Sequence, residues 1–167
     1  MSTLALRHHS ATVSNSIFLE QGEIRATAHA EIISTILGSC VSVCLFDPSS
    51  RISGMNHFLL AEAGDNPPSS RYGDIAIEQL ITTMVQVGAN RSRLVAKVFG
   101  GGAVLPLAAP HAFIGRDNVR VATQELARHR IPVVAQSTGG TQGMLIKLLT
   151  TTGDVFAKKL GPMNGQV

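Results

Sequence analysis

A turn flanked by two apolar runs constrains the fold of this chain more than any other feature of the sequence. Residues 41–46 are apolar and rich in β-branched side chains, which is typical of a buried strand. Residues 47–51 contain the turn-forming side chains of Asp47 and Pro48, and residues 52–60 form a second run in which apolar side chains recur. The sequence therefore predicts an antiparallel β-hairpin whose first strand is buried.

The rest of the chain predicts more strands and two helices. Strands are expected at residues 24–30, 31–36, 94–99, 133–136, 145–149 and 155–158, with a surface loop at residues 61–72. One helix is expected to begin at the N-cap Asp74 and end near Gly88, and another to span residues 117–130. Because strands outnumber helices and hairpins are mixed with helical crossovers, the predicted fold class is α+β with mixed β-sheets.

The length of 167 residues fits one domain. We expect residues 1–16 to form a flexible N-terminal tail, residues 17–162 a single domain and residues 163–167 a C-terminal tail. A net charge of only +3, scattered basic residues and 4% aromatic residues argue against a nucleic-acid partner. No run approaches the ~20 apolar residues needed to span a bilayer, and the N-terminus lacks the apolar run of a signal peptide. These patterns predict a cytoplasmic protein with no membrane insertion and with reduced thiols.

The two cysteines differ in their settings. On an extended strand, Cys40 and Cys44 lie about 13 Å apart, which is too far for a disulfide bond. Cys44 falls inside the predicted strand, where a free cysteine usually packs as a small apolar side chain. Cys40 follows Gly38 and Ser39 at the start of the strand, where a turn leaves backbone amides unpaired and the thiol accessible. Cys40 is therefore the candidate nucleophile.

Strand pairing brings a histidine near Cys40. If Phe46 faces Ile52 across the turn, Cys40 lies opposite Phe58, and a shift of one residue places His57 opposite Cys40 instead. In such a pair the imidazole accepts the thiol proton and lowers the pKa of the cysteine below its usual ~8.5. On spacing alone, however, the two residues fit a catalytic pair or two packing residues, and this choice stays open.

Neither a metal nor another cofactor is predicted. The six histidines are dispersed, and no second cysteine or carboxylate lies at ligand spacing from Cys40 and His57. The glycines at 100–102 lack the Lys-Ser/Thr pair of a phosphate-binding loop, so a permissive turn is the better interpretation.

Several stretches, in this order, resemble the chemoreceptor glutamine deamidase family, CheD. They are residues 35–47 (TILGSCVSVCLFD), 54–60 (GMNHFLL), 71–74 (RYGD) and 96–101 (AKVFGG), followed by Ile114-Gly115 with Asn118 and by Thr138-Gly139-Gly140. The resemblance runs from Phe18 to about Leu160. It implies a layered fold with mixed sheets and flanking helices, similar to that of bacterial toxin-type cysteine deamidases.

The resemblance also implies an activity and a site. A CheD enzyme converts selected glutamines of chemotaxis receptors to glutamate with a Cys-His-Thr constellation, which assigns Cys40 as nucleophile and His57 as base. The third residue is Thr35, favoured by residue type, or Ser34; alternation along a strand puts these two on opposite faces, so only one can orient His57. Backbone N–H groups of the turn at Gly38 and Ser39 are expected to hold the oxyanion.

The same resemblance implies partners, and one departure from the family pattern supports an alternative function. The implied substrate is a helix of a methyl-accepting chemotaxis receptor, and the loop that ends at Arg71 and Tyr72 is the expected surface for gripping it. Family members also hydrolyse glutamyl methyl esters, and some bind a CheC-type phosphatase. This chain has Ser137 and Met144 where the family has Asp and Arg. That departure supports an alternative function, a non-catalytic regulator that binds the receptor or the phosphatase.

Overall fold

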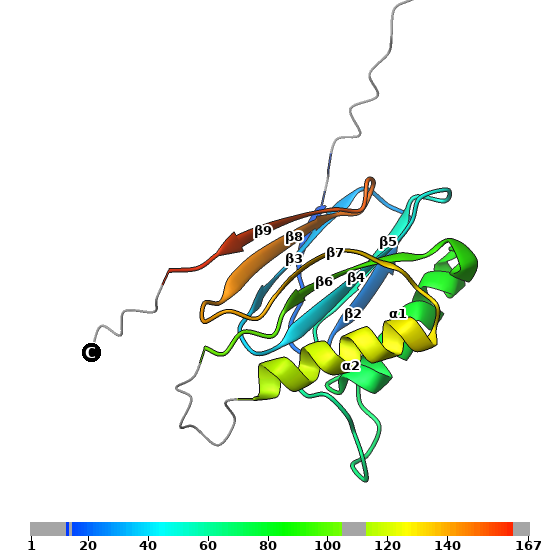
Figure 1. The fold of residues 1–167 in the computed structure, drawn as a ribbon. Helices are drawn as coiled ribbons and strands as arrows, with labels where there is room; N and C mark the ends of the chain where they lie inside the picture. Colours follow the sequence, from blue (N-terminus) through cyan, green and yellow to red (C-terminus); the bar gives the residue numbers. More distant parts are fainter. Residues whose placement is uncertain (1–12, 14, 105–112, 162–167) are drawn as a thin grey trace, which may run out of the picture.

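The computed structural model describes residue 13, residues 15–104 and residues 113–161. Two β-sheets lie face to face, and two helices cover the other side of one of them (Figure 1). The smaller sheet has the strand order β1-β3-β8-β9, and the larger has the order β2-β5-β4-β6-β7. The strands are β1 (Asn15–Phe18), β2 (Ile24–Thr27), β3 (Glu31–Leu37), β4 (Val41–Asp47), β5 (Ile52–Asn56), β6 (Val95–Gly100), β7 (Val133–Thr138), β8 (Met144–Leu149) and β9 (Asp154–Lys159), and the helices are α1 (Gly73–Val87), the short 3-10 helix η1 (Arg91–Arg93) and α2 (Ile114–Arg128).

This arrangement confirms the α+β prediction. Parallel pairs (β1 with β3, β6 with β7) occur beside antiparallel ones, so both sheets are mixed. The predicted hairpin is the β4–β5 pair in the middle of the larger sheet. In the part of the chain that the structure describes, no helix is long and apolar enough to cross a membrane.

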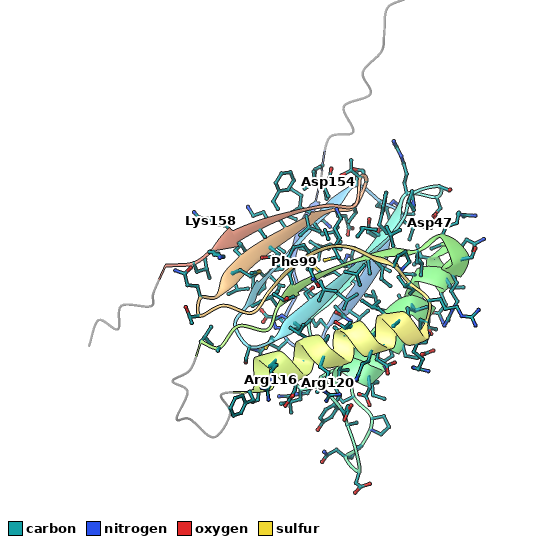
Figure 2. The ribbon with its side chains drawn as sticks, in the orientation of Figure 1. Asp47, Phe99, Arg116, Arg120, Asp154 and Lys158 are labelled. Carbon is teal, nitrogen blue, oxygen red and sulfur yellow. The ribbon has the colours of Figure 1, made fainter. Side chains whose placement is uncertain are left out.

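The alternation of side chains along β4 separates two cores. Val41, Val43 and Leu45 point toward the helices, where they pack with the buried stripe of α1. Cys44 points the other way and packs between the two sheets with Phe99, which Figure 2 labels in the middle of the molecule. Cys44 is 3% exposed, as the sequence predicted, and its burial raises the pKa of its thiol to about 12.

The hairpin register differs from both predicted registers. Asp47, not Phe46, is opposite Ile52, and at the far end of the pair Val41 is opposite Phe58. The difference arises because the turn holds four residues between the paired positions rather than five. His57 is therefore not directly opposite Cys40, but side-chain alternation still places the two on the same face, one diagonal step apart.

Three element boundaries also correct the predictions. Strand β1 begins at Asn15, inside the predicted tail, because its backbone pairs with β3. The N-cap of α1 is Tyr72, and Asp74 lies inside the helix, where its carboxylate accepts hydrogen bonds from the backbone N–H groups of Ala63 and Ile75. Helix α2 begins three residues before residue 117, while α1 ends at Gly88 with a φ of 117°, as predicted from glycine. Residues 1–12, 14 and 162–167, which include most of the predicted tails, lie outside the described residues.

Candidate active site

The candidate site forms where the chain passes from one sheet to the other. Thr35 lies near the end of β3 in the smaller sheet and points inward, and residues 38–40 carry the chain across to β4 in the larger sheet. Cys40 is the last residue of this crossing, which we call the nucleophile loop (Gly38, Ser39 and Cys40). His57 follows β5, the neighbour of β4, and is 3% exposed. Residues from both sheets thus meet at one end of the interface between them.

Thr35 orients the histidine. The Thr35 Oγ1 atom is 2.8 Å from Nδ1 of His57 and donates to the carbonyl oxygen of Leu19 at 2.7 Å. A hydroxyl carries one hydrogen, and the Leu19 carbonyl can only accept, so the contact with His57 is one in which Nδ1–H donates to Thr35. This assigns the tautomer: Nε2 carries a lone pair, and it is buried with no hydrogen-bond partner among the described residues. Nε2 is therefore the ring atom that can accept a proton.

Ser34 does not reach the histidine. Its side chain is on the opposite face of β3, and its hydroxyl donates to the carbonyl oxygen of Ile17 at 3.3 Å. Of the two hydroxyl residues that the sequence offered, the structure brings only Thr35 to His57.

Burial disfavours the charged form of both the thiol and the imidazole. Cys40 is half-buried, and burial raises the pKa of its thiol, an effect only partly offset by the residue's own backbone N–H. Burial likewise lowers the pKa of His57. The sequence-based expectation that the pair depresses the thiol pKa is therefore wrong for the free chain. The physical reason is that desolvation dominates, and no hydrogen bond joins the thiol to His57 in the described residues.

Each of the three carbonyl groups of the nucleophile loop accepts a hydrogen bond. The Gly38 oxygen accepts from the Gly102 N–H at 2.9 Å, and the Cys40 oxygen accepts from the Gly101 N–H at 2.8 Å. Between them, the Ser39 oxygen accepts from the side-chain amide of Asn118 at 3.0 Å. The N–H groups of Ser39 and Cys40 donate to no acceptor within the described ranges. The oxyanion-binding role of the turn stays a prediction, and these two N–H groups are the donors that it would use.

The glycines at 100–102 do more than turn the chain. A Cβ on Gly100 would be 2.2 Å from the Cys40 carbonyl oxygen, and one on Gly101 would be 2.3 Å from the side chain of Val119. Both have positive φ values, 102° and 69°, which glycine alone adopts readily. From the sequence, these glycines are predicted only to form a turn. Their contact with the nucleophile loop depends on β6 lying beside β4, which the sequence did not predict.

Arg71 and Tyr72 lie next to the segment that follows His57. The Arg71 carbonyl oxygen accepts from the N–H groups of Leu59 and Leu60, and Tyr72 pairs with Leu60. The Arg71 residue is exposed, and Tyr72 lines a cavity of about 360 Å³ together with Leu60, Asn118 and Arg120. A second cavity of about 370 Å³ touches His57 and Thr35 and is bordered by Phe18 and Ile36, each half exposed. Within the described residues, no three His, Cys, Asp or Glu side chains gather as a metal site would require.

Comparison with known proteins relates this chain to one family. The family model described as CheD chemotactic sensory transduction matches residues 59–159. The probable chemoreceptor glutamine deamidase CheD of Rhodospirillum rubrum is 43% identical over 86% of this chain and 81% of its own length. The probable chemoreceptor glutamine deamidase CheD 1 of Anaeromyxobacter dehalogenans is 40% identical over 86% of this chain and 84% of its own.

A weaker likeness is found among solved structures. The crystal structure of the Bacillus licheniformis hypothetical protein YfiH aligns with a TM-score of 0.48 and 14% identity, over 71% of this chain and 51% of that one. The family model and the two relatives cover most of the chain at an identity well above that of unrelated proteins. This chain is a member of the CheD family.

Proposed function

We propose that this protein is a glutamine deamidase that hydrolyses side-chain carboxamides of chemotaxis receptors to carboxylates. The observation that carries the proposal is the buried Thr35–His57 hydrogen bond, which leaves Nε2 of His57 free on the strand face that it shares with Cys40. The relatives' names supply the substrate class. Receptor signalling helices lie in the cytoplasm, so we place the reaction there.

The first half of the reaction is acyl transfer to sulfur. The Cys40 Sγ attacks the carboxamide carbon as Nε2 of His57 takes the thiol proton, because burial disfavours a separated thiolate and imidazolium before the substrate binds. The C–N bond breaks as the imidazolium returns that proton to the leaving nitrogen. The products of this half are ammonia and a glutamyl thioester on Cys40.

The second half is hydrolysis. A water molecule gives a proton to Nε2 of His57 and attacks the thioester carbon, and the C–S bond breaks as sulfur regains the proton. Glutamate is released and the site returns to its starting state. A glutamyl methyl ester fits the same sequence, with methanol leaving in place of ammonia, so we propose that esters are substrates as well.

Charge that develops on the carbonyl oxygen needs donors. The unused N–H groups of Ser39 and Cys40 are suited to this role, and the loop passes Val104 so closely that a Cβ on Gly38 would lie 3.3 Å from its side chain. One such donor is typically worth about 3 kcal/mol in the transition state. We propose that these backbone groups form the oxyanion hole.

The substrate glutamine has to be presented on a receptor helix. The exposed Arg71 and the cavity wall at Tyr72 lie on one side of the segment after His57, and the apolar border of Phe18 and Ile36 lies on the other. We propose that the helix crosses this end of the molecule and that Arg71 and Tyr72 contact it.

The test compares two cysteines in the same protein. A receptor cytoplasmic fragment is incubated with wild type, Cys40→Ala or Cys44→Ala, and conversion of Gln to Glu is followed by peptide mass spectrometry. Cys44 is a matched control because it packs between the sheets, away from the proposed chemistry. Wild type and Cys44→Ala should deamidate the fragment and Cys40→Ala should not. Deamidation by all three proteins, or by none, would refute the proposal.

The non-catalytic alternative loses one of its supports. Met144 is 3% exposed and packs between the sheets, so the departure at this position changes the core rather than a partner contact. Ser137 is half exposed at the edge strand β7 and is still a candidate contact for a CheC-type phosphatase. A regulator of this kind would bind the receptor fragment without converting any glutamine, which the same mass spectrometry distinguishes.

A further inference from the structure

Asn118 is a buried polar side chain that the proposed chemistry does not use directly. It lies on the inward face of α2, one helical turn before Ala122 and two before Leu126, and it is 0% exposed. Its Nδ2 atom donates two hydrogen bonds, to the carbonyl oxygen of Ser39 at 3.0 Å and to that of Leu59 at 2.8 Å. Ser39 directly precedes Cys40, and Leu59 is two residues after His57. One side-chain amide therefore joins the two segments that carry the candidate nucleophile and base.

The orientation of this amide is fixed by chemistry. Both partners are carbonyl oxygens, which only accept, so the NH₂ group has to face them. Its Oδ1 atom is left buried with no partner among the described residues. A buried, unpartnered carbonyl is destabilising, whereas leucine at this position would pack with the rest of the apolar stripe without burying an amide. An asparagine used only for packing would be a poor choice here.

The bond to Ser39 sets the direction of a neighbouring N–H. In a planar trans peptide, the carbonyl of one residue and the N–H of the next point in opposite directions. The Ser39–Cys40 peptide bond is trans, so when Asn118 holds the Ser39 oxygen toward α2, the Cys40 N–H points away from α2. The Cys40 N–H therefore points to the side of the loop away from α2, where it has no acceptor among the described residues.

We propose that Asn118 is a positioning residue for the oxyanion hole: by fixing the plane of the Ser39–Cys40 peptide, it aims the Cys40 N–H at the carbonyl oxygen of the bound acyl group. The hydrogen bond to the Leu59 carbonyl oxygen holds the segment after His57 to the same Asn118 side chain. The Cys40 N–H and the His57 imidazole therefore keep a fixed position relative to each other. The Gly101 and Gly102 bonds fix the peptides on either side, and among the described residues Asn118 alone holds the Ser39 carbonyl. The inference builds on the proposed function, and its test has an arm that does not need glutamine.

The test separates two reactions of Cys40. Acylation by p-nitrophenyl acetate forms an S–C bond and releases p-nitrophenolate through an oxyanion, whereas alkylation by iodoacetamide displaces iodide at a saturated carbon with no oxyanion. Both need an accessible thiol. In Asn118→Ala, the rate of acylation should fall by about 10- to 100-fold, which is less than the loss expected when an oxyanion donor is removed outright. The rate of alkylation should stay at the wild-type value. On the receptor fragment, kcat should fall by the same factor and KM should not change.

Two further variants keep the result decisive. Leu126→Ala lies on the same face of α2 and should lower the melting temperature but neither rate. Asn118→Leu keeps the branched shape and the number of heavy atoms of the side chain and removes both N–H donors, so it gives the same test if Asn118→Ala does not fold. Acylation at the wild-type rate, or acylation and alkylation falling together, would overturn the inference. The ester arm does not need glutamine. If wild type deamidates no receptor fragment while Asn118→Ala loses acylation, the proposed glutamine substrate is refuted and the inference about Asn118 stands.

Discussion

The two ends of strand β4 bury polar groups in opposite ways. At the Asp47 end, the carboxylate is 0% exposed and both of its oxygens are paired, although the hydroxyl of Ser50 in the adjoining turn is buried without a partner in the described residues. Oδ1 accepts from Nε of Arg93 and from the Ser49 N–H, and Oδ2 accepts from Arg93 and from the Asn90 N–H. At the Cys40 end, Nε2 of His57 and Oδ1 of Asn118 are buried without partners in the described residues, and two backbone N–H groups are unused.

This difference separates groups that hold the fold from groups to which we assign the proposed chemistry. Buried polar atoms in native proteins are nearly always paired, so a cluster of unpaired ones calls for an explanation. The Asp47 carboxylate connects the hairpin turn to η1 through its hydrogen bonds, and both of its oxygens are already paired. Figure 2 shows Asp47 at the opposite end of the molecule from Arg116, which lies near the start of α2. The Cys40 end keeps an acceptor and two donors free, as acyl transfer requires. Changes at the two ends should therefore act on different quantities.

The largest effect on turnover after loss of Cys40 itself is expected from His57→Gln. This change removes the group that accepts and returns the proton, which is worth about 10²- to 10⁴-fold in rate. Deamidation of the receptor fragment, followed by released ammonia, should fall by that factor, while thermal melting shows a folded protein. Retention of more than about a tenth of the wild-type rate, well above the ~1% that a 100-fold loss would leave, would show that His57 is not the base.

A smaller loss is expected from Thr35→Val, which is nearly isosteric and removes only the hydroxyl. Without it, Nδ1 loses its acceptor and the other tautomer becomes available. An orienting carboxylate in another triad is worth about 10⁴-fold, and for a neutral hydroxyl we expect about 10²-fold in kcat. Thr35→Ser should restore most of the rate, and Ser34→Val, on the opposite face of β3, should leave it unchanged. Equal losses in the Thr35 and Ser34 variants would contradict the assignment.

The elements of the fold could be predicted because they depend on local patterns. The strand at residues 41–46, the turn and the apolar stripe of α1 were each recognisable from composition and spacing, and each is present within a few residues. The pairing register was not predictable, because it depends on how many residues the turn leaves unpaired. The N-cap prediction failed for a similar reason: Asp74 has the right side chain, but its carboxylate bonds to Ala63, eleven residues earlier.

The candidate site was predictable only in part. Cys40, His57 and Thr35 came from residue type and a family resemblance, and the geometry brings Thr35 to His57. Asn118 and the glycines at 100–102 reach the nucleophile loop from α2 and β6, contacts between segments far apart in sequence. One local signal existed for Asn118: it is a polar residue at a position of the helix where the spacing of Val121, Ala122 and Leu126 calls for an apolar one.

The protonation state of Cys40 gives a sharper test of the free site. Burial raises the pKa of Cys40 and lowers that of His57, so the thiol should be protonated at neutral pH. The rate of alkylation by iodoacetamide should then rise about tenfold per pH unit from pH 7 to beyond about 8.5, because the thiolate is the reactive form. Cys44, buried with a pKa of about 12, does not contribute. A rate that is already level between pH 6 and about 8 would show a thiolate–imidazolium pair instead.

The smallest effect on turnover is expected at the other end of β4. Asp47→Asn removes the charge that pairs with Arg93, and the amide cannot accept at both positions, so the melting temperature should fall by about 3–10 °C while kcat is unchanged.

The pairing with Arg93 holds the pKa of Asp47 far below the unfolded value of about 3.9, so its contribution to stability is complete above that pH and is lost as the pH falls below it. The difference in melting temperature between wild type and variant should therefore shrink on acidification from pH 7 to about 3. Asp154→Asn, an exposed carboxylate at the start of β9, is the matched control and should change neither quantity. A loss of kcat in folded Asp47→Asn would break the division between the two ends, because it would mean that the paired carboxylate also sets the geometry around Cys40.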